Sequence, residues 1–242
     1  MTVETIEYQV GSTHFRGALV ADGPSAGRPL LLVAPNWLGP TEGAVARART
    51  LVAPGYVGFV VDMYGEGRTA AGPPEAMPLA GALRGDPAER RRRILGSLDA
   101  FLEACRARGI GDAGNVAAVG FCFGGGNVLE LARAGAALKA AICFHGDLTS
   151  PLPAAPGIVT APLLVLHGAA DPIAPKSERD GFEAEMNAAG ARWQMQTFGG
   201  AVHSFAEEEA DEPGVAAYDA VAARYAYATT ERFLADAFSG AL

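Results

Sequence analysis

The sequence has few cysteines and no long uninterrupted apolar run. Its three cysteines, Cys105, Cys122 and Cys143, are odd in number and form no Cys-x-x-Cys pair, so neither a disulfide framework nor a zinc site is expected. The weakly charged stretch at residues 115–129 falls short of the roughly 20 apolar residues that a membrane span needs. We therefore expect a reducing compartment, no bound metal and no membrane-spanning segment.

Positive charge is scarce as well. Lysine and arginine total 19 against 27 aspartates and glutamates, which gives a net charge of −8. This balance argues against binding to nucleic acid or to anionic membrane surfaces, because both select for basic patches. Residues 1–7 lack the basic and apolar regions of a signal peptide. We expect a cytoplasmic protein without nucleic-acid or membrane partners, as a monomer or a homodimer.

Length and hydrophobic patterning favour one α/β domain over residues 1–242. Half of the residues are hydrophobic, enough for a large core. Short apolar runs alternate with helical patterns, which predicts a mostly parallel sheet with helices on both faces, opened by an antiparallel strand pair. The Pro/Gly-rich residues 70–87 are expected to form a capping loop. The expected strands are 5–10, 14–20, 29–34, 56–61, 115–119, 140–144, 162–167 and 193–198, and the expected helices are 41–52, 86–108, 123–134, 177–189 and 215–234.

The segment that carries chemistry is Gly120-Phe121-Cys122-Phe123-Gly124, between an expected strand and an expected helix. It has the pattern of a nucleophile elbow with cysteine in place of serine, and no serine lies in a Gly-x-Ser-x-Gly setting. The glycines remove side chains that would clash in a sharp strand-to-helix turn. The helix N-terminus then favours a thiolate. The alternative is that Cys122 is a small buried apolar residue.

A cysteine nucleophile needs a base, and the base needs an orienting acid. His203 follows the last expected strand, and Asp171 lies just past the strand 162–167. The chain order Cys122, Asp171, His203 is that of α/β-hydrolases. Read alone, Asp171 would be a turn residue before a proline and His203 an ordinary loop histidine. His167 is expected to pack behind the acid loop.

Acyl transfer also needs donors for the oxyanion. The N–H of Phe123, directly after the nucleophile, is the expected first donor. The second is expected from the loop after the strand 29–34, where we favour the N–H of Trp37. His145 ends a strand beside the elbow and is a candidate pocket residue.

These motifs together resemble the dienelactone hydrolase family over about residues 30–234. The resemblance rests on the cysteine elbow, on residues 55–67, on Leu166-His167-Gly168 with Asp171-Pro172, and on residues 199–205. It implies an α/β-hydrolase fold with an eight-stranded, mainly parallel sheet. It also implies cofactor-free hydrolysis of lactones or related esters through an acyl-cysteine, with Cys122, His203 and Asp171 in the catalytic roles.

Two positions depart from the family pattern. Enzymes that open dienelactones carry a glutamate where this sequence has Asn36, and an arginine that binds the substrate carboxylate where it has Glu207. Glu207 would repel a carboxylate, so we expect a neutral or differently anchored ester or lactone. The pocket is expected to be largely apolar. Its expected residues are Asn36, Leu38, Phe144, His145, Ser204 and Glu207, beside Trp37 and Phe123.

Two other functions remain open from the sequence. One is a ligand-binding or redox-regulatory protein on a hydrolase scaffold, in which Cys122 performs no hydrolysis, because a fold does not fix a function. The other is a thioesterase or acyltransferase that uses the same three residues. Labelling of the thiol across pH tests the first, and a panel of aryl esters and acyl thioesters tests the second.

Overall fold

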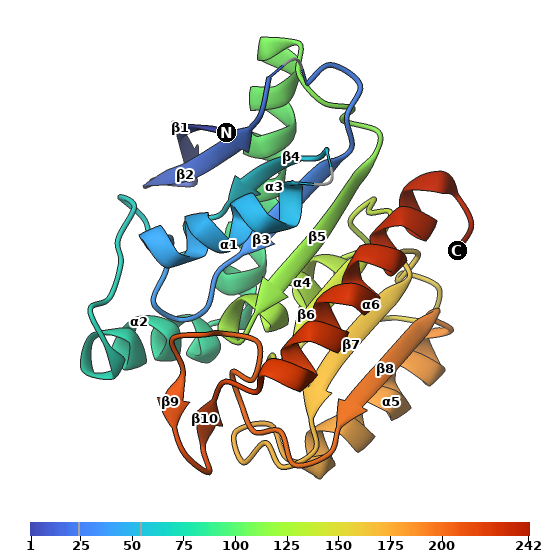
Figure 1. The fold of residues 1–242 in the computed structure, drawn as a ribbon. Helices are drawn as coiled ribbons and strands as arrows, with labels where there is room; N and C mark the ends of the chain where they lie inside the picture. The colour runs from blue at the N-terminus through green and yellow to red at the C-terminus, as the bar shows by residue number, and fades with distance from the viewer. Residues whose placement is uncertain (24, 54) are drawn as a thin grey trace. The chain divides into compact units, whose positions relative to one another are not determined.

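A computed structural model describes residues 1–23, 25–53 and 55–242. Eight strands form one sheet in the order β1-β2-β4-β3-β5-β6-β7-β8, and a small hairpin pairs β9 with β10 (Figure 1). β2 is antiparallel to β1 and β4, whereas the pairs β3–β4, β6–β7 and β7–β8 are parallel. The strands are β1 (Thr2–Val10), β2 (Thr13–Ala21), β3 (Leu30–Ala34), β4 (Val57–Val60), β5 (Val116–Phe121), β6 (Ala141–Phe144), β7 (Leu163–Gly168), β8 (Trp193–Phe198), β9 (Asp211–Glu212) and β10 (Ala216–Ala217). The prediction of an α/β-hydrolase fold with an eight-stranded, mainly parallel sheet is confirmed.

Six helices occur among the described residues. Backbone contacts group the chain into two compact units, Met1–Ala118 and Val119–Leu242. A single domain over residues 1–242 stays a prediction. The helices are α1 (Glu42–Val52), α2 (Pro73–Gly85), α3 (Pro87–Arg108), α4 (Phe123–Arg133), α5 (Lys176–Ala189) and α6 (Ala220–Ser239).

In the first unit, α1 and α3 cover opposite faces of β4. The ring of Phe59 stacks on Phe101 of α3, with ring centroids 5.1 Å apart. The neighbouring Gly58 faces α1, where an added Cβ atom would lie 2.6 Å from a methyl carbon of Val52. Because successive side chains of a strand point to opposite faces, these two contacts place helices on both sides of β4.

The prediction that residues 70–87 form a loop is wrong, because α2 occupies most of them. Pro73 and Pro74 lie at the start of this helix, where the N–H that proline lacks has no helical partner in any case. Ala76, Ala80 and Leu83 are buried and have the spacing of one helix face. Proline and glycine usually break helices, and their number in residues 70–87 obscures the apolar face in the sequence.

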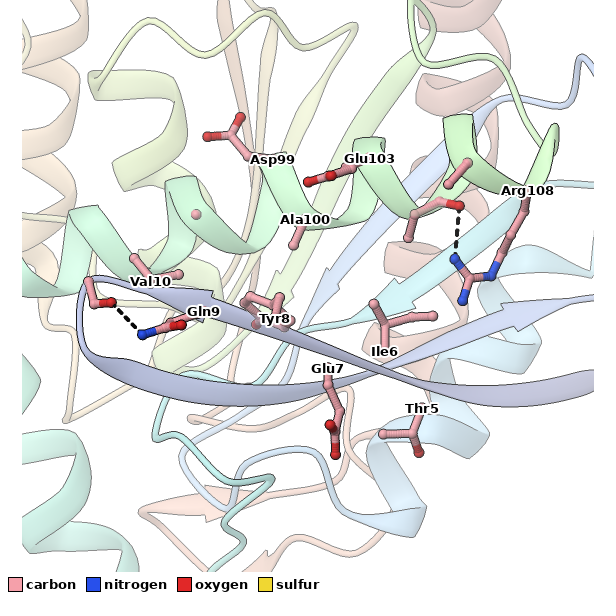
Figure 2. Close-up of a pocket in the computed structure, with 14 residues that line it drawn as sticks. Thr5, Ile6, Glu7, Tyr8, Gln9, Val10, Asp99, Ala100, Glu103 and Arg108 are labelled. Carbon is pink, nitrogen blue, oxygen red and sulfur yellow. Dashed lines mark hydrogen bonds between the residues drawn. The ribbon is translucent and has the colours of Figure 1, made fainter.

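A surface cavity of about 640 Å³ also lies in the first unit, between β1 and α3 (Figure 2). Glu7, Asp99 and Glu103 are among the residues that line it. The guanidinium of Arg108 donates to Ala104 O at 3.2 Å within α3, and this bond is drawn in the figure. The residues that line this cavity include none of the site residues predicted from the sequence.

In the second unit, α5 and α6 cover opposite faces of β8 (Figure 1). The ring of Trp193 contacts Phe182 of α5, with centroids 5.9 Å apart. Three positions along the strand, Gln196 bonds through its side chain to Thr229 of α6 at 2.8 Å. An odd spacing along a strand puts side chains on opposite faces, so helices cover both sides here too. The prediction that helices cover both faces therefore holds in each unit.

The closing helix begins later than predicted. The sequence indicated a helix from residue 215, but α6 starts at Ala220, and the hairpin of β9 and β10 takes up the residues before it. Asp219 caps the helix, since its side chain accepts from the N–H groups of Val221 and Ala222, each at 3.0 Å. Within the described ranges, no helix is both long and apolar enough to span a membrane.

Candidate active site

The glycine-flanked cysteine occupies a sharp turn between β5 and α4. Cys122 has φ 51° and ψ −122°, a backbone conformation that a non-glycine residue rarely adopts. A Cβ atom at Gly120 would lie 2.1 Å from the carbonyl oxygen of Gly124, so only glycine fits there. Cys122 is 7 % exposed, and its sulfur stands at the N-terminus of α4. This is the backbone geometry that places a nucleophile at the end of a strand.

The three predicted catalytic side chains form one hydrogen-bonded chain. The Nε2 atom of His203 lies 3.1 Å from Sγ of Cys122. On the other side of the ring, Nδ1 donates to Oδ2 of Asp171 at 2.8 Å. Asp171 and His203 are each 4 % exposed. The arrangement can remove a proton from the thiol and hold the positive charge that forms on the imidazole.

Asp171, the predicted orienting acid, is held by the backbone of its own loop, which follows β7. The second oxygen of Asp171, Oδ1, accepts from the N–H groups of Ile173 and Ala174 at 2.8 and 3.0 Å. His167 supports the same loop as predicted, since its Nε2 lies 2.9 Å from Ala174 O. A Cβ atom at Gly168 would meet a backbone oxygen at 2.5 Å, so the chain turns here against the base loop.

His203, the predicted base, is held by the hairpin of β9 and β10, which was not predicted from the sequence. The N–H of His203 donates to Val215 O at 3.1 Å, and its carbonyl accepts from Ala217 N at 3.0 Å. The hairpin thus pairs with both sides of this residue. Two sequence signals for it exist: Pro213-Gly214 is typical of a turn, and Asp219 is a helix-capping residue.

Electrostatics favour a charged imidazole. Burial lowers the pKa of His203, but the negative charge of the Cys122 sulfur and the hydrogen bonds to Asp171 and Cys122 outweigh burial and raise this pKa to about 10. Burial also acts to raise the pKa of Asp171, yet its hydrogen bond with His203, the charge of that ring and two backbone donors hold it below its usual range. The site therefore favours an ionised Asp171 beside a protonated His203.

The remaining predicted residues of the second unit are all buried. The Phe144 ring stacks on Phe121 with centroids 4.6 Å apart, while its carbonyl accepts from Cys122 N at 3.0 Å. His145 is fully buried, and its ring lies against that of His203. Ser204 directly follows the base with φ 54°. Ser204 is 9 % exposed, Glu207 2 % and Phe123 1 %.

The residues predicted to complete the site from the first unit lie on the loop after β3. The Asn36 side chain accepts from Leu38 N at 3.0 Å, and Trp37 O accepts from the hydroxyl of Tyr64 at 2.7 Å. These bonds fix the shape of the loop. The roles of Asn36, Trp37 and Leu38 stay predictions.

The other two cysteines differ from Cys122. Both are completely buried, and burial raises the pKa of Cys105 to about 11 and that of Cys143 to about 12. Such thiols stay protonated and unreactive at neutral pH. Across the described ranges, no group of three or more His, Cys, Asp or Glu side chains has the arrangement of a metal site.

Comparisons with known proteins identify the family of this chain. The model of the dienelactone hydrolase family matches residues 16–238. The crystal structure of P91, a dienelactone hydrolase-like promiscuous phosphotriesterase from metagenomic libraries, is 34 % identical, with a TM-score of 0.88 over 98 % of both chains. A dienelactone hydrolase from Anabaena variabilis shares the fold, with 20 % identity and a TM-score of 0.67 over 96 % of this chain and 97 % of that one.

An uncharacterized protein of Caenorhabditis elegans is 33 % identical over 156 residues, which cover 62 % of this chain and 98 % of that protein. The matched family model spans nearly the whole sequence, including the elbow and the loops of Asp171 and His203. This chain therefore belongs to the dienelactone hydrolase family and is a hydrolase.

Proposed function

We propose that this chain is a carboxylic ester hydrolase that cleaves a small ester or lactone through an acyl-cysteine. Cys122 is the nucleophile, His203 the general base and acid, and Asp171 the group that orients the base. The observation that carries the proposal is the buried chain of contacts from Sγ through the imidazole to the carboxylate, at 3.1 and 2.8 Å. Its position at the end of β5 supports the same roles.

In the first half-reaction, Nε2 of His203 takes the thiol proton and the sulfur of Cys122 attacks the substrate carbonyl carbon. The oxygen of the tetrahedral intermediate carries the negative charge, and the N–H groups of Phe123 and Trp37 are its proposed donors. The carbon–oxygen bond of the ester then breaks, and the leaving alkoxide receives the proton from Nε2. The acyl group remains bound to sulfur.

In the second half-reaction, water replaces the alcohol. Nε2 of His203 takes a proton from the water, whose oxygen attacks the thioester carbon. The carbon–sulfur bond breaks, the sulfur leaves as a thiolate, and the acid product departs. No cofactor takes part in this scheme. Asp171 stays ionised throughout and stabilises the imidazolium in both steps.

The substrate is proposed to be neutral near its reacting group. Glu207 is a carboxylate within four residues of the base, and Asn36 has no charge. A substrate carboxylate would meet repulsion from Glu207 instead of an arginine fork. The expected pocket residues Asn36, Leu38, Phe144, His145, Ser204 and Glu207 keep their proposed roles.

The proposal is tested with a panel of aryl esters, lactones and acyl thioesters, followed by mass spectrometry of the quenched enzyme. We expect an acyl adduct on the peptide that contains Cys122, and no turnover by Cys122→Ala. Cys143→Ala is the matched control, since this thiol is buried and remains protonated. Turnover that survives in Cys122→Ala would overturn the proposal, and preferred transfer from thioesters would indicate the thioesterase or acyltransferase alternative.

A second candidate activity is the hydrolysis of phosphotriesters. It rests on the 34 % identity to P91 over nearly the full length of both chains. The same sulfur would attack phosphorus and expel an aryloxide, which leaves a phosphorylated cysteine for water to release. Diethyl 4-nitrophenyl phosphate is a suitable probe. Steady release of nitrophenolate that requires Cys122 supports this activity, and release of one equivalent only would indicate inhibition.

The rival reading is a protein that binds or senses without hydrolysis. Iodoacetamide labelling across pH separates the two, because an activated thiolate reacts well below the pKa of about 8.5 of a free cysteine. An unreactive Cys122 in the folded protein would favour the non-hydrolytic reading.

A further inference from the structure

His145 lies against the proposed base, in a contact that the reaction scheme does not use. The ring centroids of His145 and His203 are 5.3 Å apart, with the planes at 65°. On another side, the ring of His145 meets Phe205 at 5.3 Å and 79°. Edge-to-face packing of this kind is the favourable arrangement for neighbouring aromatic rings. His145 is fully buried, so its ring is held inside the protein.

The backbone at His145 is held in an unusual conformation. Its φ is +37°, which is uncommon for a residue other than glycine. The N–H of His145 donates to Leu166 O at 2.8 Å, which ties it to β7. At the next residue, a Cβ on Gly146 would lie 2.7 Å from Gly126 N, so the chain runs directly against the first turns of α4. Strain of this kind persists only where the surroundings fix the backbone, and it is concentrated at functional sites.

A buried ionic cluster anchors the same segment three residues later. Leu148 N donates to Glu178 at 3.2 Å, and Leu148 O accepts from Nη2 of Arg133 at 2.6 Å. The Arg133 side chain is 1 % exposed and pairs with Glu185 at 2.7 Å and with Glu130 at 3.2 Å. Charged hydrogen bonds in a dry interior are strong. The loop after β6 is therefore fixed at both ends around His145.

Two hydrogen bonds do not fully fix the imidazole of His203. One bond runs from Nδ1 to Asp171, and the other contact joins Nε2 to Cys122. The two contacts lie on opposite sides of the ring and define an axis across it. The plane of the imidazole can still tilt about this axis. A third contact is needed to stop that tilt. We propose that His145 is a positioning residue, whose ring holds the imidazole of His203 in the plane that directs Nε2 at the sulfur of Cys122.

This inference rests on the proposed function of Cys122 and His203, and it predicts which half-reaction depends most on His145. When sulfur carries an acyl group, the contact of Nε2 with the thiol is lost, and Asp171 alone bonds to the imidazole. The ring of His145 then matters most, because Nε2 must face the incoming water. Loss of the ring should slow deacylation more than acylation.

The test compares His145→Leu, which removes the ring, with His145→Phe, which keeps one. We expect His145→Leu to lower kcat by about 10- to 100-fold, a larger effect than any change in KM, since small displacements of catalytic groups have effects of this size. It should also accumulate the acyl-enzyme and move the pH midpoint of Cys122 alkylation upward. His145→Phe should restore all three readouts. Should the leucine variant fail to fold, His145→Asn removes the ring with a residue that tolerates positive φ.

Phe182→Ala is the matched control, because it removes a buried ring that contacts Trp193 instead of the base. It should lower thermal stability and leave the alkylation profile unchanged. A folded variant without the ring that has normal kcat and a normal pH profile of Cys122 alkylation would overturn the inference. A rise in KM alone would also overturn it, as would a failure of His145→Phe to restore activity. If the proposed function itself were wrong, the wild-type protein would show no alkylation at low pH, and its activity would not require Cys122.

Discussion

The Nε2 atom of His203 lies 3.1 Å from the sulfur of Cys122, and both side chains are almost fully buried. A protonated imidazole and a thiolate stabilise each other strongly at this distance, because little water screens them. The pKa of His203 therefore depends on the presence of the Cys122 sulfur. The first two predictions concern this pair and the acid behind it.

The first prediction concerns the titration of His203. Its pKa of about 10 depends in large part on the sulfur, so Cys122→Ala should deprotonate the imidazole at a lower pH than wild type. The measurement is the NMR titration of the His203 ring, assigned with His203→Gln. Since this pKa exceeds the ~6.5 of an unfolded histidine, the group's contribution to stability is fully present below pH ~6.5 and is lost as pH rises through about 10. Equal titration of both proteins would contradict the ion pair.

The second prediction concerns the acid. Asp171→Asn should lower kcat by about 10³-fold or more, because an amide cannot stabilise the imidazolium and favours the wrong ring tautomer. The asparagine oxygen can still accept from Ile173 N and Ala174 N, so the loop and the melting temperature should change little. Steady-state kinetics and thermal unfolding measure the two effects. A fall in kcat of less than about ten-fold would remove Asp171 from its proposed role.

The third prediction concerns the hairpin behind the base. Ala217→Pro removes the N–H that donates to His203 O, and should lower kcat by about ten-fold or more through displacement of the ring. Ala217→Ser keeps the N–H and serves as the matched control. Kinetics are compared at a temperature where both variants are folded by circular dichroism. Normal kcat in folded Ala217→Pro would show that the hairpin does not position the base.

The fourth prediction concerns the elbow. Gly120→Ala places a methyl group 2.1 Å from the backbone oxygen of Gly124, so the free energy of unfolding should fall by about 3 kcal/mol or more. Gly81→Ala is the control, because nothing lies within 4 Å of that position on α2 and alanine favours a helix by about 1 kcal/mol. Urea unfolding measures both. Similar stability of the two variants would contradict the packing described here.

Much of the fold could be predicted, because buried parallel strands leave continuous apolar runs. β8 has the predicted bounds, Trp193–Phe198, and most other strands differ by only a few residues. The family and the chain order of the three site residues could also be predicted, since the glycines of the elbow have a steric cause visible in sequence. The close approach of Cys122, Asp171 and His203 is consistent with the roles proposed for them.

Two parts of the structure differ from the prediction, for different physical reasons. The prolines and glycines of α2 are typical of a loop in sequence, although the first turn of a helix tolerates proline. The hairpin was missed because strands of two residues carry no periodic pattern, and its link to His203 runs through backbone atoms alone. The contact of His145 with the base depends on a backbone angle of +37° that no sequence motif signals.

The links between the acid loop, the base loop and the hairpin have an evolutionary consequence. Ala169 N and Ala170 N donate to Phe198 O and Ala201 O, at 2.8 and 3.0 Å, and the hairpin binds His203 in the same way. Bonds between backbone atoms survive most exchanges of side chains. Mutations along these loops can thus change the side chains around Asp171 and His203 while these two residues keep their places, which gives this scaffold room to acquire new substrates.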